Sequence, residues 1–494
     1  MPSPGPERSD LAAALERLAG VPVLVLGDIM LDRFVYGTVE RISPEAPIPV
    51  LRIAQESAML GGAGNVLRNL AALGARPHGI AVVGEDAAGA EVEELARTCL
   101  EPVAGEIELL RTPARRTTMK DRFIAAGQQL LRVDRDPEGG LDAETKARVK
   151  TAALAAVAKA SAVIISDYGK GLLDEALIAA VVAAAGAHGC PVVVDPKGRD
   201  FARYRGAAWV TPNRRELAEA SGLATGDGDA VAAAARKVIA EAGVAAVLAT
   251  RSEQGMTLAT DAGVHHLKAE AREVYDVSGA GDTVVATFAA ALGAGLDAVT
   301  AAQLANVAAA IVVGKLGTAV ARPGEILHAL HASDLLAAEA KVADLDSLGE
   351  QVAQWRKAGL KIGFTNGCFD LLHPGHVSLL EQARAACDRL IVGLNSDASV
   401  RRLKGETRPV QGEAARAAVL ASLASVSRVV LFGEDTPLAL IEALKPDVLV
   451  KGADYSVEQV VGADIVQAYG GKVVLAELSP GHSTTATIAR LNGG

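Results

Sequence analysis

The chain has 494 residues, too many for one ordinary hydrophobic core, so two or more domains are expected. Half of its residues are hydrophobic and 22% are charged, which is the balance of a folded globular protein and excludes a disordered one. A net charge of -10 argues against a general nucleic-acid binder, because that class needs a basic surface.

The termini and the cysteines bear on the compartment. The opening residues, MPSPGPERSD, contain no apolar signal core, and the longest apolar runs, such as Leu177 to Ala187, are too short to span a bilayer. Cys99, Cys190, Cys368 and Cys387 have no paired spacing, so neither a disulfide framework nor a zinc ribbon is expected. These features predict a cytoplasmic protein that does not enter membranes.

In the first part of the chain, short β-rich runs alternate with alanine-rich helical stretches. Strands are expected at 21–28, 161–169, 191–198 and 244–252, and helices at 141–160, 172–188 and 228–241. This alternation predicts parallel sheets in a doubly wound α/β fold. Residues 35–54 and 117–134 read as strands without a helix between them, so we expect a small antiparallel lid over a cleft.

The pattern changes near residue 322, where a polar helical region over 325–358 begins. A strand at 360–367 restarts the alternation, and further strands are expected at 390–397, 427–435 and 446–454. The sequence therefore predicts a first domain at 1–330, a linker at 331–345 and a second, smaller parallel α/β domain at 346–494.

The segment DVSGAGDTVVATF, residues 276–288, contains the strongest signal of the first domain. Gly279, Ala280 and Gly281 are small enough for backbone N–H groups to converge on an anion at the start of the following helix. Asp282 would then lie within reach of a hydroxyl that attacks a γ-phosphate, where it would act as a general base. From this motif alone, a glycine-rich turn with an acidic residue stabilising the helix stays equally open.

Other polar residues follow strands or open helices. Asp28 and Asp32 in GDIMLD, and Asn65 in GGAGN, are suited to hold sugar hydroxyls. The segment TPNRRE, residues 211–216, puts Asn213 and Glu216 on one side of a turn. Two interpretations are open for the basic residues Lys120, Arg122 and Lys197. They are either solvated surface charges or groups that bind a phosphate already on the sugar.

Taken in order, GGxxN, TPNxxE and DVSGAGD make the first roughly 325 residues resemble the ribokinase family of sugar kinases. The resemblance implies that Asp282 is the catalytic base, that Gly279, Ala280 and Gly281 form the anion hole, and that Mg2+ accompanies the ATP. It implies ATP contacts at Asn213, Arg214, Arg215, Glu216, Thr250 and Gly255. It implies sugar contacts at Asp28, Asp32, Gly62, Asn65 and Lys197, and a homodimer formed through the lid of the kinase domain.

In the second domain, the segment NGCFDLLHPGHVSLL, residues 366–380, places His373 and His376 between a strand and a helix. A dedicated metal site is not expected, because the neighbouring residues match no standard ligand spacing. A plain loop remains possible from the pair alone. The favoured reading is phosphate binding, in which both histidines and free backbone amides stabilise charge on an α-phosphate under in-line attack.

GCFDxLHxGH, NSDxxVxxxKG, RP, VKGxD and the late STT occur in order, so residues 358–494 resemble the nucleotidyltransferase superfamily of cytidylyltransferases. The resemblance implies that His373 and His376 stabilise the transferred phosphate. It also implies nucleotide contacts at Phe369, Lys404, Lys451, Ser483, Thr484 and Thr485. The late motif of the superfamily often continues to an arginine, and Arg490 lies near that position without a firm register.

The two halves in this order resemble the bifunctional heptose 7-phosphate kinases and heptose 1-phosphate adenylyltransferases of Gram-negative bacteria. The resemblance implies phosphorylation of D-glycero-β-D-manno-heptose 7-phosphate at its anomeric hydroxyl. It further implies adenylyl transfer from ATP to heptose 1-phosphate, giving an ADP-heptose for lipopolysaccharide core synthesis. Two alternatives stay open: another sugar phosphate with CTP in the second step, or a nucleotide-sensing protein with inactive sites.

Overall fold

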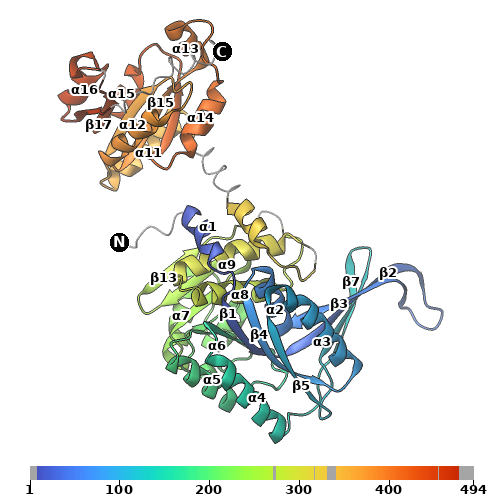
Figure 1. Cartoon of the computed structure of the whole chain (residues 1–494). Coiled ribbons are helices and arrows are strands. Elements are labelled where there is room, and N and C mark those ends of the chain that lie inside the picture. The colour runs from blue at the N-terminus through green and yellow to red at the C-terminus, as the bar shows by residue number, and fades with distance from the viewer. Residues whose placement is uncertain (1–7, 271–273, 316, 331–340, 454, 478–494) are drawn as a thin grey trace. The chain divides into compact units, whose positions relative to one another are not determined.

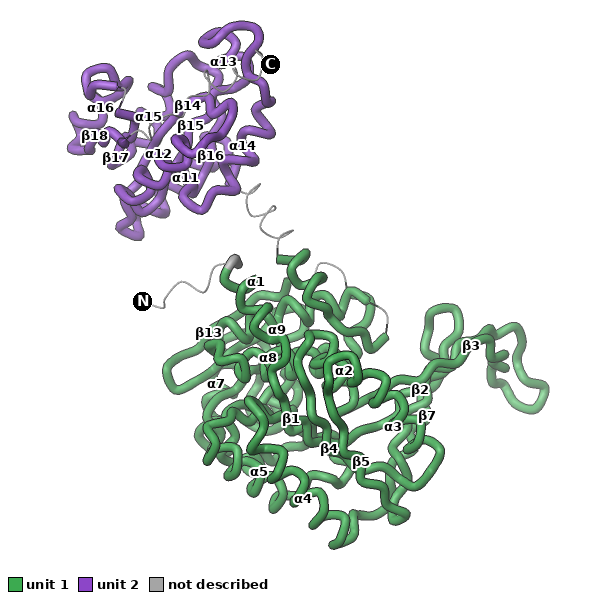
Figure 2. Tube along the Cα trace, in the orientation of Figure 1, with its two compact units in different colours: residues 1–330 green, residues 331–494 purple. Residues whose placement is uncertain are grey.

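The computed structural model describes residues 8–270, 274–315, 317–330, 341–453 and 455–477. The contacts within the chain divide it into two compact units, residues 1–330 and 331–494 (Figure 2). Each unit has a sheet of its own, with helices packed on both faces (Figure 1). The α/β fold that the sequence predicts is confirmed in both units.

The first unit is built on a nine-stranded sheet in the order β13-β12-β11-β10-β9-β8-β1-β4-β5. Seven strands are parallel: β1 (Pro22–Gly27), β4 (Arg76–Gly84), β5 (Glu106–Thr112), β8 (Ala162–Ser166), β9 (Val192–Asp195), β10 (Trp209–Val210) and β11 (Ala246–Thr250). The hairpin strands β12 (Met256–Thr260) and β13 (Gly263–Leu267) extend the sheet in antiparallel fashion. Strands such as β8 are buried along their whole length, as expected for parallel strands covered on both faces.

Helices cover both faces of this sheet. One face carries α1 (Arg8–Glu16), α2 (Ala63–Ala72), α8 (Ala280–Gly293) and α9 (Ala298–Val313). The other carries α4 (Ala143–Val157), α5 (Glu175–Ala187), α6 (Arg214–Ser221) and α7 (Gly228–Ala242). Alanine, valine and leucine dominate both cores, and Phe288 meets Trp209 edge to face at 5.0 Å between ring centroids. The small side chains let the helices approach the sheet closely.

A second, four-stranded sheet forms the lid, in the order β3-β2-β6-β7. Its strands are β2 (Ile29–Ile42), β3 (Pro49–Gly62), β6 (Met119–Ala125) and β7 (Gln128–Arg135), and α3 (Ala87–Leu100) packs beside their base (Figure 1). The expected antiparallel pairing holds for both hairpins, but β2 and β6 pair in parallel. The reason is topological: between β2 and β6 the chain returns through β4 and β5 of the main sheet, so both strands leave it in one direction.

The second unit has a five-stranded parallel sheet in the order β16-β15-β14-β17-β18. Its strands are β14 (Ile362–Gly367), β15 (Arg389–Asn395), β16 (Arg428–Phe432), β17 (Val448–Gly452) and β18 (Lys472–Ala476). Helices α12 (Pro374–Ala385) and α14 (Glu413–Ser422) cover one face, while α11 (Leu345–Lys357), α15 (Leu438–Leu444) and α16 (Ala463–Ala468) cover the other. Helix α13 (Asp397–Lys404) follows β15.

Both sheets contain a point where the strand order reverses, which is where open α/β sheets bind ligands at the carboxyl ends of their strands. In the first unit this point lies between β1 and β8, and in the second between β14 and β17. Among the helices of the described segments, none is long and apolar enough to cross a membrane.

Candidate active sites

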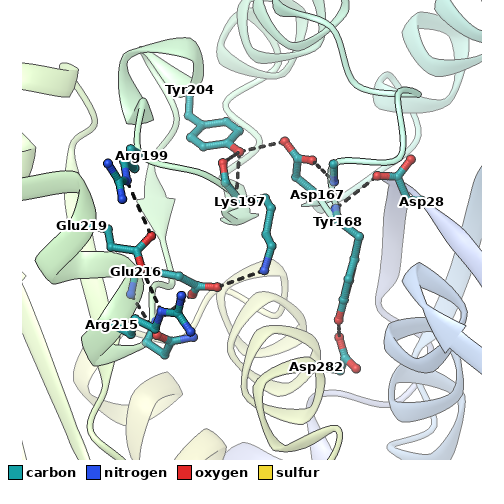
Figure 3. Close-up of polar contacts among 12 residues, drawn as sticks. Asp28, Asp167, Tyr168, Lys197, Arg199, Tyr204, Arg215, Glu216, Glu219 and Asp282 are labelled. Carbon is teal, nitrogen blue, oxygen red and sulfur yellow. Dashed lines mark hydrogen bonds and ion pairs between the residues drawn. The ribbon is translucent and has the colours of Figure 1, made fainter. Parts of the chain in front are cut away.

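A polar cavity lies at the carboxyl ends of the central strands of the first unit. It is lined by residues that come from five separate parts of the chain: Asp167, Tyr168, Asp195, Pro196, Lys197, Thr211, Asn213, Glu216, Thr250, Gly279, Gly281 and Asp282. Seven of the predicted kinase site residues are in this set: Lys197, Asn213, Glu216, Thr250, Gly279, Gly281 and Asp282. Figure 3 shows how several of these side chains converge.

Asp282 lies in the first turn of α8, and its carboxylate is buried. One oxygen, Oδ2, accepts a hydrogen bond of 2.7 Å from Asn65 Nδ2, and the other, Oδ1, accepts one of 2.8 Å from Tyr168 Oη. The preceding Gly279 has φ 79°, and a Cβ there would lie 2.7 Å from Asn65 Nδ2. Only glycine therefore allows the turn and the close approach of Asn65 to Asp282.

The environment of Asp282 raises the pKa of its carboxyl group. Burial raises the pKa of Asp282 to about 6, although the hydrogen bonds from Asn65 and Tyr168 favour the ionised form and lower it. A carboxylate with a pKa near the operating pH can both lose a proton at rest and accept one during a reaction.

Arg68, which the sequence reading missed, fixes the orientation of Asn65. Its Nη1 donates to Asn65 Oδ1 at 3.0 Å and to the Thr318 carbonyl at 3.1 Å, so the amide nitrogen of Asn65 must face Asp282. Asn65 and Arg68 are three residues apart on α2, so their side chains share one face of the helix. This spacing could have predicted their contact from the sequence. The sequence analysis predicts that Asn65 contacts the sugar, and that contact stays a prediction.

Asp28 precedes β2, Asp32 lies within it, and the two aspartates have different partners. The Asp28 carboxylate accepts the backbone N–H groups of Tyr168 at 3.1 Å, Lys170 at 2.9 Å and Leu172 at 3.4 Å, so it holds the loop after β8. Burial raises the pKa of Asp28 against the effect of these bonds. Asp32 Oδ1 lies 2.9 Å from Arg122 Nη1, with both side chains largely buried. Contact of either aspartate with a sugar stays a prediction.

Two lysines lie at or near the cavity. Lys120 Nζ lies over the Tyr168 ring, 5.7 Å from its centroid, and burial lowers the pKa of this lysine. Lys197 Nζ lies 3.7 Å from Glu216 Oε1 (Figure 3). Lys120 therefore lies on the lid side and Lys197 next to the predicted ATP segment.

The predicted ATP segment opens α6 with a capping box. Asn213 Oδ1 accepts from Glu216 N at 2.9 Å, and Glu216 Oε2 accepts from Asn213 N at 3.1 Å. Thr250 pairs with Asn213 in a parallel β-bridge, which brings the end of β11 to the same place.

Three residues of the ATP prediction lie outside the lining of the cavity. Arg215 is exposed and pairs with Glu219 at 2.8 Å, and Arg214 precedes it at the start of α6. Gly255 has φ 88° and forms the turn before β12, where a Cβ would lie 2.0 Å from the Leu267 carbonyl oxygen. Gly62, of the sugar prediction, has φ 57° and caps α2, where a Cβ would lie 2.4 Å from the Asp28 carbonyl oxygen. Their contacts with ligands stay predictions.

The sequence reading missed Tyr168 and Asp195. Tyr168 lies two residues after β8 and Asp195 ends β9, so the rule that ligands bind at the carboxyl ends of parallel strands could have pointed to both. Burial, followed by the charges of Asp282 and Glu216, raises the pKa of Asp195 well above its ordinary value.

In the second unit, the residues after β14 fold into a tight loop that leads into α12. Phe369 has φ 42°, a backbone conformation unusual for a residue with a large side chain, and its ring packs edge to face on His376 at 5.2 Å. His373 is the residue before α12, and its ring stacks on that of His376 with 3.8 Å between centroids. The predicted histidine pair is thus brought together at a helix N-terminus.

Burial and the neighbouring His373 lower the pKa of His376 to about 4. The imidazole is therefore neutral at pH 7, with one nitrogen as a donor and the other as an acceptor. Lys404 ends α13 close enough for its charge to act on His376, and it is exposed.

A set of buried polar contacts holds this loop, and the sequence reading missed most of it. Arg416 is fully buried, donates to the Cys368 carbonyl at 2.6 Å and pairs with Asp397 at 2.7 Å. Asp370 pairs with Arg408 and accepts the Val410 N–H at 2.7 Å.

Lys451 lies across the strand-order reversal from the histidines. Its Nζ donates to the Asn366 carbonyl at 2.9 Å, so it braces the end of β14. The remaining predicted contacts, Ser483, Thr484 and Thr485, lie outside the described residues, as does Arg490.

Comparison with known proteins finds a different family in each of the two units. Residues 22–324 match the model of the pfkB family of carbohydrate kinases, and residues 364–488 match a cytidylyltransferase-like model. The solved ribokinase of Arabidopsis thaliana, complexed with ribose and ATP, covers 63% of this chain and 99% of its own, with a TM-score of 0.51 and 20% identity. The structure of phosphofructokinase-2 of Escherichia coli, in complex with substrates and products, aligns with 64% of this chain over 99% of its own length, with a TM-score of 0.54 and 19% identity. At these identities the likeness shows the fold alone.

Two relatives match over nearly their whole length. The bifunctional protein HldE of Paramagnetospirillum magneticum is 58% identical over 490 residues, which cover 99% of each chain. That of Rhodospirillum rubrum is 58% identical over 492 residues, which cover 99% of this chain and 98% of the relative. The chain therefore belongs to the HldE family of bifunctional proteins, which join a heptose kinase to an adenylyltransferase in ADP-heptose biosynthesis.

Proposed function

We propose that the two activities are divided between the two units, with Asp282 as the general base of the kinase and the His373–His376 pair as the phosphate-binding centre of the adenylyltransferase. The observation that carries the kinase assignment is a buried carboxylate at a helix N-terminus, with each oxygen held by one hydrogen-bond donor. Full-length likeness to HldE proteins does not favour a CTP-dependent enzyme or an inactive nucleotide sensor.

In the kinase unit, the anomeric hydroxyl of D-glycero-β-D-manno-heptose 7-phosphate attacks the γ-phosphorus of ATP, and ADP leaves. Asp282 takes the hydroxyl proton as the O–P bond forms. The proposed anion hole is the turn of Gly279, Ala280 and Gly281 at the start of α8. The Ala280 N–H donates to the Val277 carbonyl at 3.3 Å, so the N–H groups of Gly279 and Gly281 are the ones proposed to meet the transferring phosphoryl group. A Cβ at Gly281 would meet no protein atom within 4 Å, which supports an approach of phosphate to this backbone.

Mg2+ fits the carboxylate side of the same cavity. Asp195, Glu216 and Asp282 all line it. Burial, followed by the charges of Asp282 and Glu216, raises the pKa of Asp195, so a divalent cation there would relieve the repulsion between these carboxylates. Glu216 and Asp195 would hold the ion with ATP oxygens, where it would neutralise the triphosphate.

The lid side of the cavity suits a sugar that already carries a phosphate. Lys120 is half-buried beside Tyr168, and Arg122 lies on the same strand paired with Asp32. We assign the 7-phosphate to this side because Lys197, on the other side, already faces Glu216. Partial burial strengthens an ammonium–phosphate pair, since less water screens it.

In the transferase unit, an oxygen of heptose 1-phosphate attacks the α-phosphorus of ATP, and pyrophosphate leaves. The nucleophile is already an anion, so the site must supply donors and positive charge rather than a base. His373 and His376, near the N-terminus of α12, and Lys404 provide these. Phe369 fixes the His376 ring, and Lys451 fixes the end of β14. The segment 483–485 is proposed to contact the triphosphate.

The same proposal includes a homodimer in the cytoplasm. The lid carries exposed apolar side chains that a second copy would cover: Tyr36, Val39, Ile42, Ile48, Ile53, Leu130 and Leu131. Free thiols at all four cysteines support a reducing compartment. Light scattering of the purified protein tests the dimer, and a monomeric mass at micromolar concentration would reject it.

The proposed division is tested by ³¹P NMR on two samples of the protein with Mg2+ and ATP. One sample receives heptose 7-phosphate, and we expect a new anomeric phosphate signal with ADP. The other receives heptose 1-phosphate, and we expect a coupled pair of diphosphate signals with pyrophosphate. Silence in both samples, with ATP binding intact, would overturn the assignment.

A further inference from the structure

Tyr168 reaches the carboxylate of Asp282 from a different element than Asn65 does. It lies two residues after the end of β8, and its side chain extends from the loop at residues 167–172 to Asp282 (Figure 3). Its hydroxyl donates to Asp282 Oδ1 at 2.8 Å, while Lys120 lies over its ring. The tyrosine thus lies between the predicted base and the predicted phosphate-binding lysine.

The loop that carries Tyr168 is tightly held. Asp28 accepts three of its backbone N–H groups, those of Tyr168, Lys170 and Leu172. Asp167 accepts the N–H of Gly169 at 2.8 Å and is itself bound by the Tyr204 hydroxyl at 2.8 Å. A side chain projecting from so constrained a loop is well placed to fix another group, because little rotational freedom remains to be lost.

The two hydrogen-bond donors hold different oxygens of the Asp282 carboxylate. Asn65 holds Oδ2 from α2, and Tyr168 holds Oδ1 from the loop after β8, so together they oppose rotation of the carboxylate. Burial, followed by the charge of Asp282, raises the pKa of Tyr168 well above 10, so its hydroxyl stays a donor at neutral pH. A hydrogen bond to a carboxylate favours the ionised form, which is the form a general base needs.

We propose that Tyr168 is a positioning residue of the kinase site, whose hydroxyl holds the Asp282 carboxylate in the orientation and ionised state that accept the sugar proton. The proposal rests on the proposed role of Asp282 as the base. Phenylalanine at position 168 would keep the ring beside Lys120 and remove only the donor.

Other charges also act on Asp282, and all of them remain in this variant. They come from β2, β6, β9 and α2, namely Asp32, Lys120, Asp195 and Arg68. A change in the titration of Asp282 on removal of one hydroxyl is therefore assigned to that hydroxyl.

The test compares the pH dependence of kinase kcat and kcat/KM in the wild type and in Tyr168→Phe, with heptose 7-phosphate and ATP. Loss of the donor raises the pKa of Asp282, so we expect the acid limb to move upward by about one pH unit. The phosphate of the substrate titrates in the same range, but it does so equally for both proteins and cancels in the comparison. We expect kcat at pH 6 to fall about fivefold, with KM for the sugar phosphate within about twofold.

Tyr204→Phe is the control for the loop, because it removes a buried tyrosine hydroxyl that lies 2.8 Å from a carboxylate oxygen of Asp167 in the same loop, while both hydrogen bonds to Asp282 remain. We expect its acid limb at the wild-type pH. Adenylyl transfer measured on the same samples reports that the second unit is intact, and thermal unfolding reports the fold of the first unit.

Two outcomes would overturn the proposal. One is an unshifted acid limb in Tyr168→Phe, whether or not the rate falls uniformly at all pH values. The other is an equal shift in Tyr204→Phe. Asp282→Asn separates this failure from failure of the proposed function: if that variant keeps its kinase activity, Asp282 is not the base, and the role assigned to Tyr168 falls with it.

Discussion

On the proposed assignment, the two units use different groups for a similar reaction, the attack of an oxygen on a phosphorus of ATP. The first unit buries a carboxylate whose pKa burial raises to about 6. The second stacks two imidazoles, one of which burial keeps neutral with a pKa of about 4. The difference follows from the nucleophile: a sugar hydroxyl must lose a proton, whereas a sugar phosphate is already charged and needs only donors around the phosphorus.

The supports of the two sites differ as well. Asp282 is fixed by side chains from α2 and from the loop after β8, which lie far apart in the chain. The histidine loop is fixed mainly through its backbone and its neighbours, by Arg416 and by the Asp370–Arg408 pair. On the proposed assignment, a variant of the kinase site changes the base or its orientation, while a variant of the transferase site changes the shape of a phosphate-binding loop.

The largest expected effect is on the base. Asp282→Asn should lower kinase kcat by about 10²–10⁴-fold, the usual contribution of a general base. A coupled assay of ADP release measures it. Asp297→Asn is the control, because Asp297 also opens a helix of this unit but only caps its amides. A kinase rate in Asp282→Asn within tenfold of the wild type would remove the carboxylate from the mechanism.

The next effect concerns the imidazole pair. His376→Ala should lower adenylyl transfer by about 10²–10³-fold, because it removes a donor to the phosphorus under attack. Pyrophosphate release measures this rate. Gln382→Ala, on the same helix and bound to Ser378 and Glu477, should stay within about twofold of the wild type, since it leaves the histidine pair in place. If both variants lost the same share of the activity, the loss would come from damage to the structure of α12 and not from removal of the imidazole.

A smaller effect is expected on the lid side of the kinase cavity. Lys120→Met should raise KM for heptose 7-phosphate by about 10–100-fold, the loss of one charge-assisted contact, with a smaller change in kcat. Lys146→Met removes a lysine that pairs with Asp174 at the surface and is the control. An unchanged KM in Lys120→Met would assign the phosphate to other groups.

The smallest effect is a pH dependence in the wild-type kinase. Because Asp282 must be ionised to accept a proton, kcat/KM should fall as the pH drops through about 6, by about tenfold at pH 5. The ionisation of the substrate phosphate is measured separately by its ³¹P shift and divided out. A corrected rate that stays flat down to pH 5 would contradict the raised pKa.

Sequence patterns predicted those parts of the sites that depend on local chemistry. A glycine-rich turn before a helix led to Asp282, and a strand, a turn and a helix led to His373 and His376. In each case the residue type and the element it starts are enough to suggest an anion site. The parallel sheets followed from strand–helix alternation in the same way.

The supporting residues could not be predicted, because their partners are distant in sequence. Tyr168 meets Asp282 across 114 residues, and Arg68 reaches the Thr318 carbonyl across 250. The sugar contact predicted for Asp28 stays a prediction, and nothing in the sequence indicated that its carboxylate also accepts backbone N–H groups of the 168–172 loop. The parallel pairing of β2 with β6 likewise depends on the path of the chain between them.

The most direct test of the account is a crossed measurement, in which both reactions are followed in folded preparations of Asp282→Asn and of His376→Ala. Two separate sites predict that each variant loses one reaction and keeps the other within about twofold of the wild type. If either substitution abolished both reactions while circular dichroism and thermal unfolding stayed unchanged, the division of labour between the two units would be wrong.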